Sequence, residues 1–235
     1  MTNFTQETQV GTLVAERPSR ARVFERYGID YCCGGKLSLA EACAKKNIRA
    51  DELLGALRKA DATSEPAQRD WNQAPLHQLL DHILATHHVY LHEELPRLAR
   101  IVDKVARVHG ENHPELLRVR EIYVSMAGEL NLHMQKEEHI LFPLIRQLET
   151  ATSAPRFHCG TVENPINVML MEHDSTGEAL AAIRKATKDY APPPDACNTY
   201  RAMLDGLAQL ERDTHQHIHL ENNVLFPRAQ ALENA

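Results

Sequence analysis

The sequence predicts an all-α protein, with a small N-terminal helical domain followed by a four-helix bundle that contains an internal repeat. The segment from His133 to Pro143 has a second copy from His217 to Pro227 at a constant offset of 84 positions, and each copy carries a histidine and a glutamate four positions apart. Another pair of histidines, His88 and His173, repeats at an offset of 85. Glycine is scarce and aromatic residues make up only 5% of the chain, as in many helical proteins. These features favour two similar helical hairpins.

Each half of the repeat contains a histidine, a long gap and then the His-x-x-x-Glu pair. The gap is 45 positions between His88 and His133 and 44 positions between His173 and His217. A gap of this length fits two antiparallel helices joined by one turn. Since residues four apart share one face of a helix, the hairpins would direct four histidines and two glutamates into one bundle interior with pseudo-two-fold symmetry.

Turn-forming residues divide the chain ahead of the bundle. Short helical patterns are interrupted at Gly28 and at the Gly34-Gly35 pair, and Ser38-x-x-Glu41 is a capping box that predicts a helix start. A polar stretch without helical periodicity follows, as is typical of a linker. We therefore expect a small helical domain over residues 1–60, a linker over 61–73 and the bundle over 74–235.

Apolar residues recur at helical spacing through the rest of the chain, and prolines mark the ends of the helices. We expect four bundle helices, which run from Pro75 to about His109, from near Pro114 to Pro143, from near Pro165 to just before Pro192, and from about Ala196 to Pro227. Pro143 and Pro227 occupy the same place in the repeat. A shared backbone bend just past the His-x-x-x-Glu pairs is therefore predicted.

Composition excludes several classes of function. The chain is modestly acidic, with a net charge of −6, and has no basic patch of the kind that binds nucleic acid. No apolar run approaches the roughly 20 residues that cross a bilayer. The polar start carries no pattern of a signal peptide, so we expect a cytoplasmic protein. In that compartment the five cysteines are expected to be reduced thiols.

The repeated histidines and glutamates predict a metal centre. A single interior histidine is usually a core residue held by a hydrogen bond, but six repeated polar groups on interior faces would be costly without a cation. Imidazole and carboxylate ligands without thiolate suit iron, manganese or zinc. If both glutamates bridge two ions and an oxo or hydroxo group joins them, each ion keeps an open position. The candidate ligands are His88, His133, Glu137, His173, His217 and Glu221.

Several other histidines lie close to these ligands. His87 or His92 could replace His88 as a ligand, although the repeat alignment favours His88 because His87 would raise the offset to 86. Three more are two positions from a ligand, about 200° around the helix, and are expected at the surface or rim: His139, His215 and His219.

A family resemblance rests on two motifs. The bundle resembles hemerythrin-like di-iron proteins. Its combination with the sequence Asp30-Tyr31-Cys32-Cys33-Gly34-Gly35 resembles the repair of iron centres family, whose members repair iron–sulfur clusters. The similarity extends over nearly the whole chain. The ligands of that family fall on the six candidates given above, with Glu137 and Glu221 as bridges. Its acidic residues beside the site correspond to Glu129 and Glu172, and its vicinal cysteines correspond to Cys32 and Cys33.

The resemblance implies a di-iron site with an oxo or hydroxo bridge and a role in repairing clusters damaged by nitrosative or oxidative stress, with iron donation as one route. The alternatives are nitric oxide binding or scavenging, and nitric oxide reduction, at the same site. The implied partners are damaged iron–sulfur proteins and a small ligand such as nitric oxide. A homodimer is compatible with the sequence.

Cys32 and Cys33 allow two interpretations. Adjacent cysteines are poorly placed to chelate one metal, and a disulfide between them would be strained and easily reduced. With the resemblance, we expect a redox or iron-transfer thiol pair exposed on a glycine-rich turn. The alternative is two small, partly buried residues at a helix end. Cys43 lies on a helix face and is expected in the core.

Overall fold

The computed structural model describes residues 4–63, 69–151 and 157–234. Within these ranges the chain forms helices and no strand, apart from two isolated bridges, which confirms the all-α prediction. The described residues form two compact units. Residues 4–80, 148–151 and 215–234 belong to the first unit, and residues 81–147 and 157–214 belong to the second, with the gaps just given.

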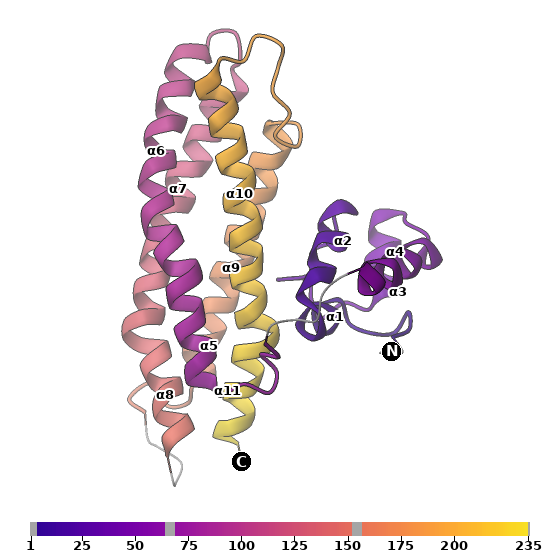
Figure 1. Cartoon of the computed structure of the whole chain (residues 1–235). Helices are drawn as coiled ribbons and strands as arrows, with labels where there is room; N and C mark the ends of the chain where they lie inside the picture. Colours follow the sequence, from indigo (N-terminus) through magenta and orange to yellow (C-terminus); the bar gives the residue numbers. More distant parts are fainter. Residues whose placement is uncertain (1–3, 64–68, 152–156, 235) are drawn as a thin grey trace. The chain divides into compact units, whose positions relative to one another are not determined.

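The N-terminal part of the first unit consists of short helices, as predicted (Figure 1). They surround a small apolar core. The helices are α1 (Val10–Glu16), the 3-10 turn η1 (Pro18–Arg20), α2 (Ala21–Arg26), α3 (Leu39–Lys46) and α4 (Ala50–Thr63). The capping box is present, because the Glu41 N–H donates to the Ser38 Oγ at 3.2 Å and the Ser38 N–H donates to the Glu41 carboxylate at 2.8 Å. The last turn of α4 lies within the segment predicted as linker.

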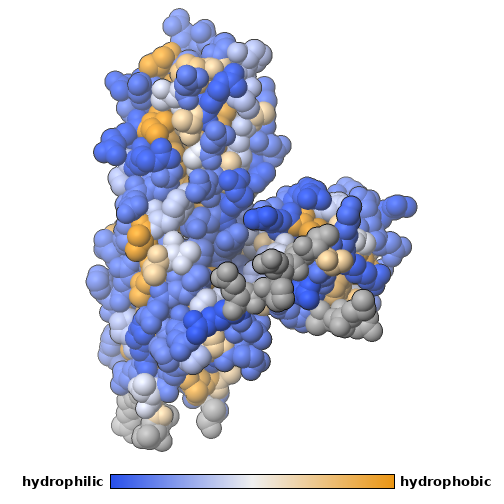
Figure 2. Space-filling view, viewed as in Figure 1, coloured by the Kyte–Doolittle hydropathy of each residue, from blue (hydrophilic) through white to orange (hydrophobic). Residues whose placement is uncertain are grey.

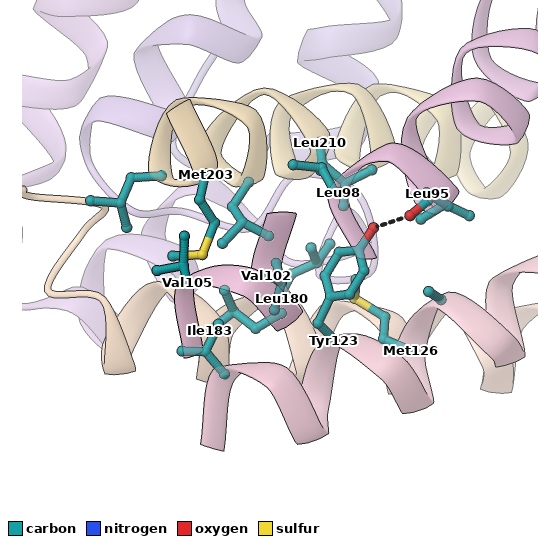
Figure 3. Packing of buried hydrophobic residues seen from close by; sticks show 14 of the residues in the cluster. Leu95, Leu98, Val102, Val105, Tyr123, Met126, Leu180, Ile183, Met203 and Leu210 are labelled. Carbon is teal, nitrogen blue, oxygen red and sulfur yellow. Dashed lines mark hydrogen bonds between the residues drawn. The ribbon is translucent and has the colours of Figure 1, made fainter. Parts of the chain in front are cut away.

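The remaining helices comprise four long ones, α6, α7, α9 and α10, and three short ones, α5, α8 and α11 (Figure 1). They are α5 (Leu76–Ile83), α6 (Val89–His109), α7 (Glu115–Lys136), α8 (Phe142–Thr150), α9 (Glu163–Ala186), α10 (Asn198–Leu220) and α11 (Phe226–Glu233). In the second unit, buried apolar side chains from α6, α7, α9 and α10 pack against one another (Figure 3). The buried Tyr123 hydroxyl donates to the Leu95 carbonyl at 2.8 Å, so its polar atom has a partner inside this core.

Three single π turns interrupt the bundle helices: η2 (Leu84–His88), η3 (Glu137–Leu141) and η4 (Glu221–Leu225). In η3 and η4 the first carbonyl accepts from the N–H five residues ahead, immediately before Pro143 and Pro227. A proline has no N–H to donate to the preceding turn, so the regular helical hydrogen bonding is interrupted here. The irregularity therefore begins at the glutamate itself and not beyond it. Single π turns inside helices are frequent at functional sites.

The surface is mainly hydrophilic. Figure 2 shows isolated hydrophobic residues on an otherwise polar face. Exposed apolar side chains such as Val108, Val124 and Met171 are scattered over the helices, which is ordinary for a globular protein. None of the described helices combines the length and the apolar character that a bilayer crossing requires.

A close helix contact at Gly206 gives a stability prediction. A Cβ at this position of α10 would lie 2.6 Å from the Cδ2 of Leu98, which is fully buried. We expect Gly206→Ala to lower the free energy of unfolding by about 1–3 kcal/mol through overpacking, measured by urea denaturation. The matched control is Gly128→Ala in α7, where a Cβ would meet no described atom within 4 Å outside its own helix. That variant should gain up to about 1 kcal/mol from helix propensity. Equal gains in both variants would contradict the packing argument.

Candidate metal centre

A buried carboxylate surrounded by imidazoles lies in the second unit. The Oε1 of Glu137 is 3.1 Å from the Nε2 of His133 and 4.0 Å from the Nε2 of His173. Its other oxygen, Oε2, is 3.4 Å from the Nε2 of His88. Each of the four side chains is at most 2% exposed. The two oxygens of one carboxylate therefore face different histidines, as a carboxylate that bridges two cations would.

Helix geometry explains how these groups meet. His133 and Glu137 are one turn apart at the end of α7, where η3 begins, so their proximity is local. His88 ends η2 ahead of α6, and His173 lies in the middle of α9. These two reach Glu137 only because α6 and α9 both pack against α7. The sequence-predicted ligands of the second unit are thus brought together from three helices.

The arrangement of imidazole nitrogens fits a metal site. The Nε2 atoms of His133 and His173 are 3.0 Å apart. Two neutral imidazoles can share one proton at this distance, or both can direct a lone pair at one cation. His133, Glu137 and His173 offer ligand atoms within 4.8 Å of one another, and so do His88 and Glu137. This His and Glu cluster could hold metal.

Two outer carboxylates orient the histidine rings. The Nδ1 of His88 lies 2.7 Å from Glu138, and the Nδ1 of His133 lies 2.9 Å from Glu172. An Nδ1–H that donates to a carboxylate leaves the Nε2 lone pair free for a cation, which is the usual second partner of metal-bound histidine. The resemblance named Glu172 but gave Glu138 no role. Its position directly after a predicted ligand was the available signal.

Both outer carboxylates are held in the charged form. Burial raises the pKa of Glu172, but hydrogen bonds from Lys136 and His133 outweigh burial, and the pKa lies below its ordinary value. The pKa of Glu138 is also lowered, because hydrogen bonds from His88 and His92 exceed the opposing effect of burial. Charged acceptors make stronger hydrogen bonds and raise the basicity of the imidazoles that they hold.

The first unit contains the second copy of the His-x-x-x-Glu pair. The Nε2 of His217 lies 3.2 Å from the Oε1 of Glu221, and both side chains are fully buried. Glu221 opens η4 as Glu137 opens η3. The repeat in the sequence is therefore a repeat in local geometry.

The other candidate residues differ in their exposure to solvent. Glu129 is exposed and accepts from the Ser125 hydroxyl at 2.8 Å. His87 is buried and pairs with Asp213 at 3.0 Å, whereas His92 is exposed on Glu138. His139 is exposed, as expected.

The expectation of a surface position is wrong for His219, which is 4% exposed. Its Nδ1 lies 3.3 Å from the Tyr31 carbonyl oxygen, so the N-terminal part of the first unit covers this side of α10. Burial lowers the pKa of His219 to about 4, although the Tyr31 carbonyl opposes the shift. Helical periodicity placed this side chain on an outer face, and it could not show that another segment packs there.

The expected exposure is also wrong for Cys32, which is 3% exposed, while Cys33 is half-buried. The hydrogen bond to Cys33 and burial both raise the pKa of Cys32 well above its ordinary value, so its sulfur is a neutral thiol in the absence of a cation. Cys43 is buried in the core, as predicted.

The contact between Glu172 and His133 gives a prediction for metal affinity. Glu172→Gln keeps an oxygen acceptor but removes the charge that holds the His133 Nδ1–H. We expect a loss of about ten- to hundredfold in metal affinity, measured by competition with a chelator. Glu178→Gln, an exposed change on the same helix, is the control and should bind metal like the unaltered chain. If the unaltered chain, Glu172→Gln and Glu178→Gln bind metal with equal affinity, Glu172 does not contribute to the site.

Comparison with known proteins identifies two domains. Residues 6–61 match ScdA_N, a domain of unknown function. Residues 79–229 match the hemerythrin HHE cation binding domain, which includes all six candidate ligands.

Similar proteins cover nearly the full length of the chain. The iron–sulfur cluster repair protein YtfE of Escherichia coli O1:K1 / APEC is 40% identical over 229 residues, which is 97% of this chain and 99% of that protein. Proteins with the same name from Escherichia fergusonii and from Escherichia coli O81 have the same identity and coverage.

Proposed function

The chain belongs to the family of iron–sulfur cluster repair proteins that includes these YtfE relatives, and we propose that it helps to restore iron–sulfur clusters damaged by nitrosative or oxidative stress. The observation that carries this proposal is the buried Glu137 carboxylate with three imidazoles at 3.1–4.0 Å, inside a domain whose family binds cations. Damaged iron–sulfur proteins would be its clients, and the cytoplasm its compartment.

We propose that six residues hold two iron ions: His88, His133, Glu137, His173, His217 and Glu221. Glu137 and Glu221 would bridge the ions, together with an oxo or hydroxo group. Two features support this assignment. Each oxygen of Glu137 faces a different histidine, and the His217–Glu221 distance of 3.2 Å repeats the His133–Glu137 distance of 3.1 Å. Glu-x-x-His and related pairs on facing helices are the usual ligands of di-iron bundles.

The donor set favours release of iron to a cluster. Imidazole and carboxylate are borderline to hard donors, whereas iron–sulfur proteins bind iron through thiolate and sulfide, which are soft donors. Ferrous iron can therefore pass from nitrogen and oxygen ligands to a sulfur-rich client. Iron would be the cargo, with accessible ferrous and ferric states. The carboxylates of Glu138 and Glu172 hold the His88 and His133 rings in place, so that the site can bind iron again after release.

The test follows iron and activity together. The full chain is loaded with iron-57 and incubated with an iron–sulfur enzyme whose cluster nitric oxide has damaged. We expect enzyme activity to return while iron-57 leaves the chain and appears in the client, measured by Mössbauer spectroscopy. The Glu137→Ala variant serves as the control and should restore no activity.

Other outcomes decide between the alternatives. Recovery of activity without loss of iron-57 would reject donation and favour removal of the nitrosyl group from the client. Stable iron nitrosyls in the chain without recovery would favour a nitric oxide scavenger. Sustained nitric oxide consumption with an electron donor would favour a reductase.

A further inference from the structure

The loop between α2 and α3 brings two thiols and a carboxylate together. Asp30, Cys32 and Cys33 each offer one ligand atom, and these atoms lie within 4.8 Å of one another. The two Sγ atoms are 3.8 Å apart, and the Cys32 Sγ lies 3.1 Å from the Asp30 Oδ1. The sequence led us to expect that adjacent cysteines are poorly placed to chelate one metal, but the loop turns both side chains to the same side.

The sulfur separation matches the requirement of a tetrahedral cation. Zinc–thiolate bonds of about 2.3 Å at a tetrahedral angle place the two sulfurs about 3.8 Å apart. Neither Cys32 nor Cys33 forms a disulfide, so both sulfurs carry a thiol proton that a cation can replace. Cys33 is half-buried and Asp30 is exposed, which leaves an open side through which an ion can enter.

Hydrogen bonds fix the carboxylate beside the sulfurs. The Asp30 Oδ1 accepts from the Cys32 and Cys33 N–H groups at 2.9 and 3.1 Å, and its Oδ2 accepts from the Gly34 N–H at 2.9 Å. The Oδ2 accepts this one N–H and has a second lone pair that can reach a cation. The three donors are therefore held close together before any ion binds, which reduces the cost of ordering them.

A second anchor holds the loop from the other side. The Asn223 Nδ2 donates to the Cys32 carbonyl at 3.0 Å. A Cβ at Gly35 would lie 2.4 Å from the Asn223 Oδ1 and 2.9 Å from the Tyr31 carbonyl oxygen, so only glycine allows this approach. The loop that carries Cys32 and Cys33 is thus held by a hydrogen bond and a close contact within the first unit.

We propose that Asp30, Cys32 and Cys33 form a second metal site, additional to the His and Glu centre, which binds one thiophilic divalent cation of the zinc class. The cation would replace the two thiol protons, which leave to solvent, and no electron is transferred. Thiolate donors select zinc-class ions over hard cations such as magnesium. Three protein ligands leave the fourth tetrahedral position for water or for a thiolate of another molecule.

Cobalt(II) is the probe, because thiolate-to-cobalt charge transfer absorbs in the near ultraviolet and His and Glu ligands do not produce this band. The full chain, iron-loaded and reduced under anaerobic conditions, is titrated with cobalt(II). We expect the band to saturate at one cobalt per chain. Cys32→Ser and Cys33→Ser should each abolish it. Asp30→Asn should weaken cobalt binding by at least about tenfold, since loss of even an outer partner of a metal ligand costs that much.

The remaining cysteines provide the control. A variant with Cys43→Ala, Cys159→Ser and Cys197→Ser keeps the loop and should retain the full band. Loss of the band in this triple variant, or its persistence in Cys32→Ser, would overturn the site. The absence of a band at one equivalent would also overturn it. Unchanged affinity in Asp30→Asn would reject the carboxylate as a ligand. The iron content and helical circular dichroism of each variant establish that it is folded.

Discussion

The Glu137→Ala variant is expected to be purified almost free of iron while it keeps its helical fold. Glu137 is fully buried and lies within 4.0 Å of three candidate histidine ligands, so its removal takes away a neighbour of each of them. Loss of an outer partner of a metal ligand costs ten- to hundredfold in affinity, and loss of a shared carboxylate should cost more. Iron is measured by metal analysis and by absorption in the near ultraviolet, where the proposed oxo bridge would absorb.

The helical fold should remain although iron is lost. In the absence of iron, Glu137 is a buried carboxylate, and its removal relieves the free-energy cost of its desolvation. We therefore expect the iron-free variant to show the same helical circular dichroism as the iron-free parent. The control is Glu121→Ala, an exposed change on the same helix. A full iron content in Glu137→Ala would refute the ligand assignment.

A second variant tests whether the two copies of the repeat act together. Glu221→Leu changes the corresponding residue in the first unit. If Glu137 and Glu221 bridge the same ions, each single substitution should remove both irons together. Retention of iron in Glu221→Leu would show that the second copy has no part in the centre.

The largest loss of stability is expected from Arg20→Met in the N-terminal part of the first unit. The Arg20 guanidinium is fully buried and donates to both oxygens of Asp61, at 3.0 and 2.8 Å, and to the Leu13 carbonyl at 3.0 Å. Removing Arg20 takes its hydrogen bonds from the Asp61 carboxylate, which is 18% exposed and keeps Arg17 at 3.6 Å, and each buried polar group that loses its partner costs about 1–3 kcal/mol, more where it is charged. Urea denaturation, with hydrogen exchange of the amides in α1 and α2, measures the effect.

The pH dependence of this effect has a defined sign. Burial raises the pKa of Asp61, but the Arg20 hydrogen bonds and charge outweigh burial, so the pKa falls below its ordinary value of 3.8. The pair therefore stabilises the fold fully above pH 3.8 and less as the pH drops through the lowered pKa. The difference between the parent and Arg20→Met should shrink in acid. The control is Arg118→Met, whose pair with Glu121 is exposed and should change stability by no more than about 0.5 kcal/mol.

The sequence determined the features that depend on neighbouring positions along a helix. It predicted the all-α class, the capping box at Ser38, and the His133–Glu137 and His217–Glu221 pairs, because residues four apart share a helix face wherever the helix packs. The duplicated spacing then pointed to His88 and His173 as their partners. The assignment of these six residues as iron ligands stays a prediction.

Only the tertiary structure decided which groups from different helices meet. In the structure, His88 and His173 lie beside Glu137, Glu138 contacts the His88 ring, and Glu172 contacts the His133 ring. The tertiary structure also buried Cys32 and His219, which the sequence had placed at the surface. Periodicity identifies the faces of one helix, but the segment that covers a face is fixed by packing between residues far apart in the chain, and that packing leaves no local pattern.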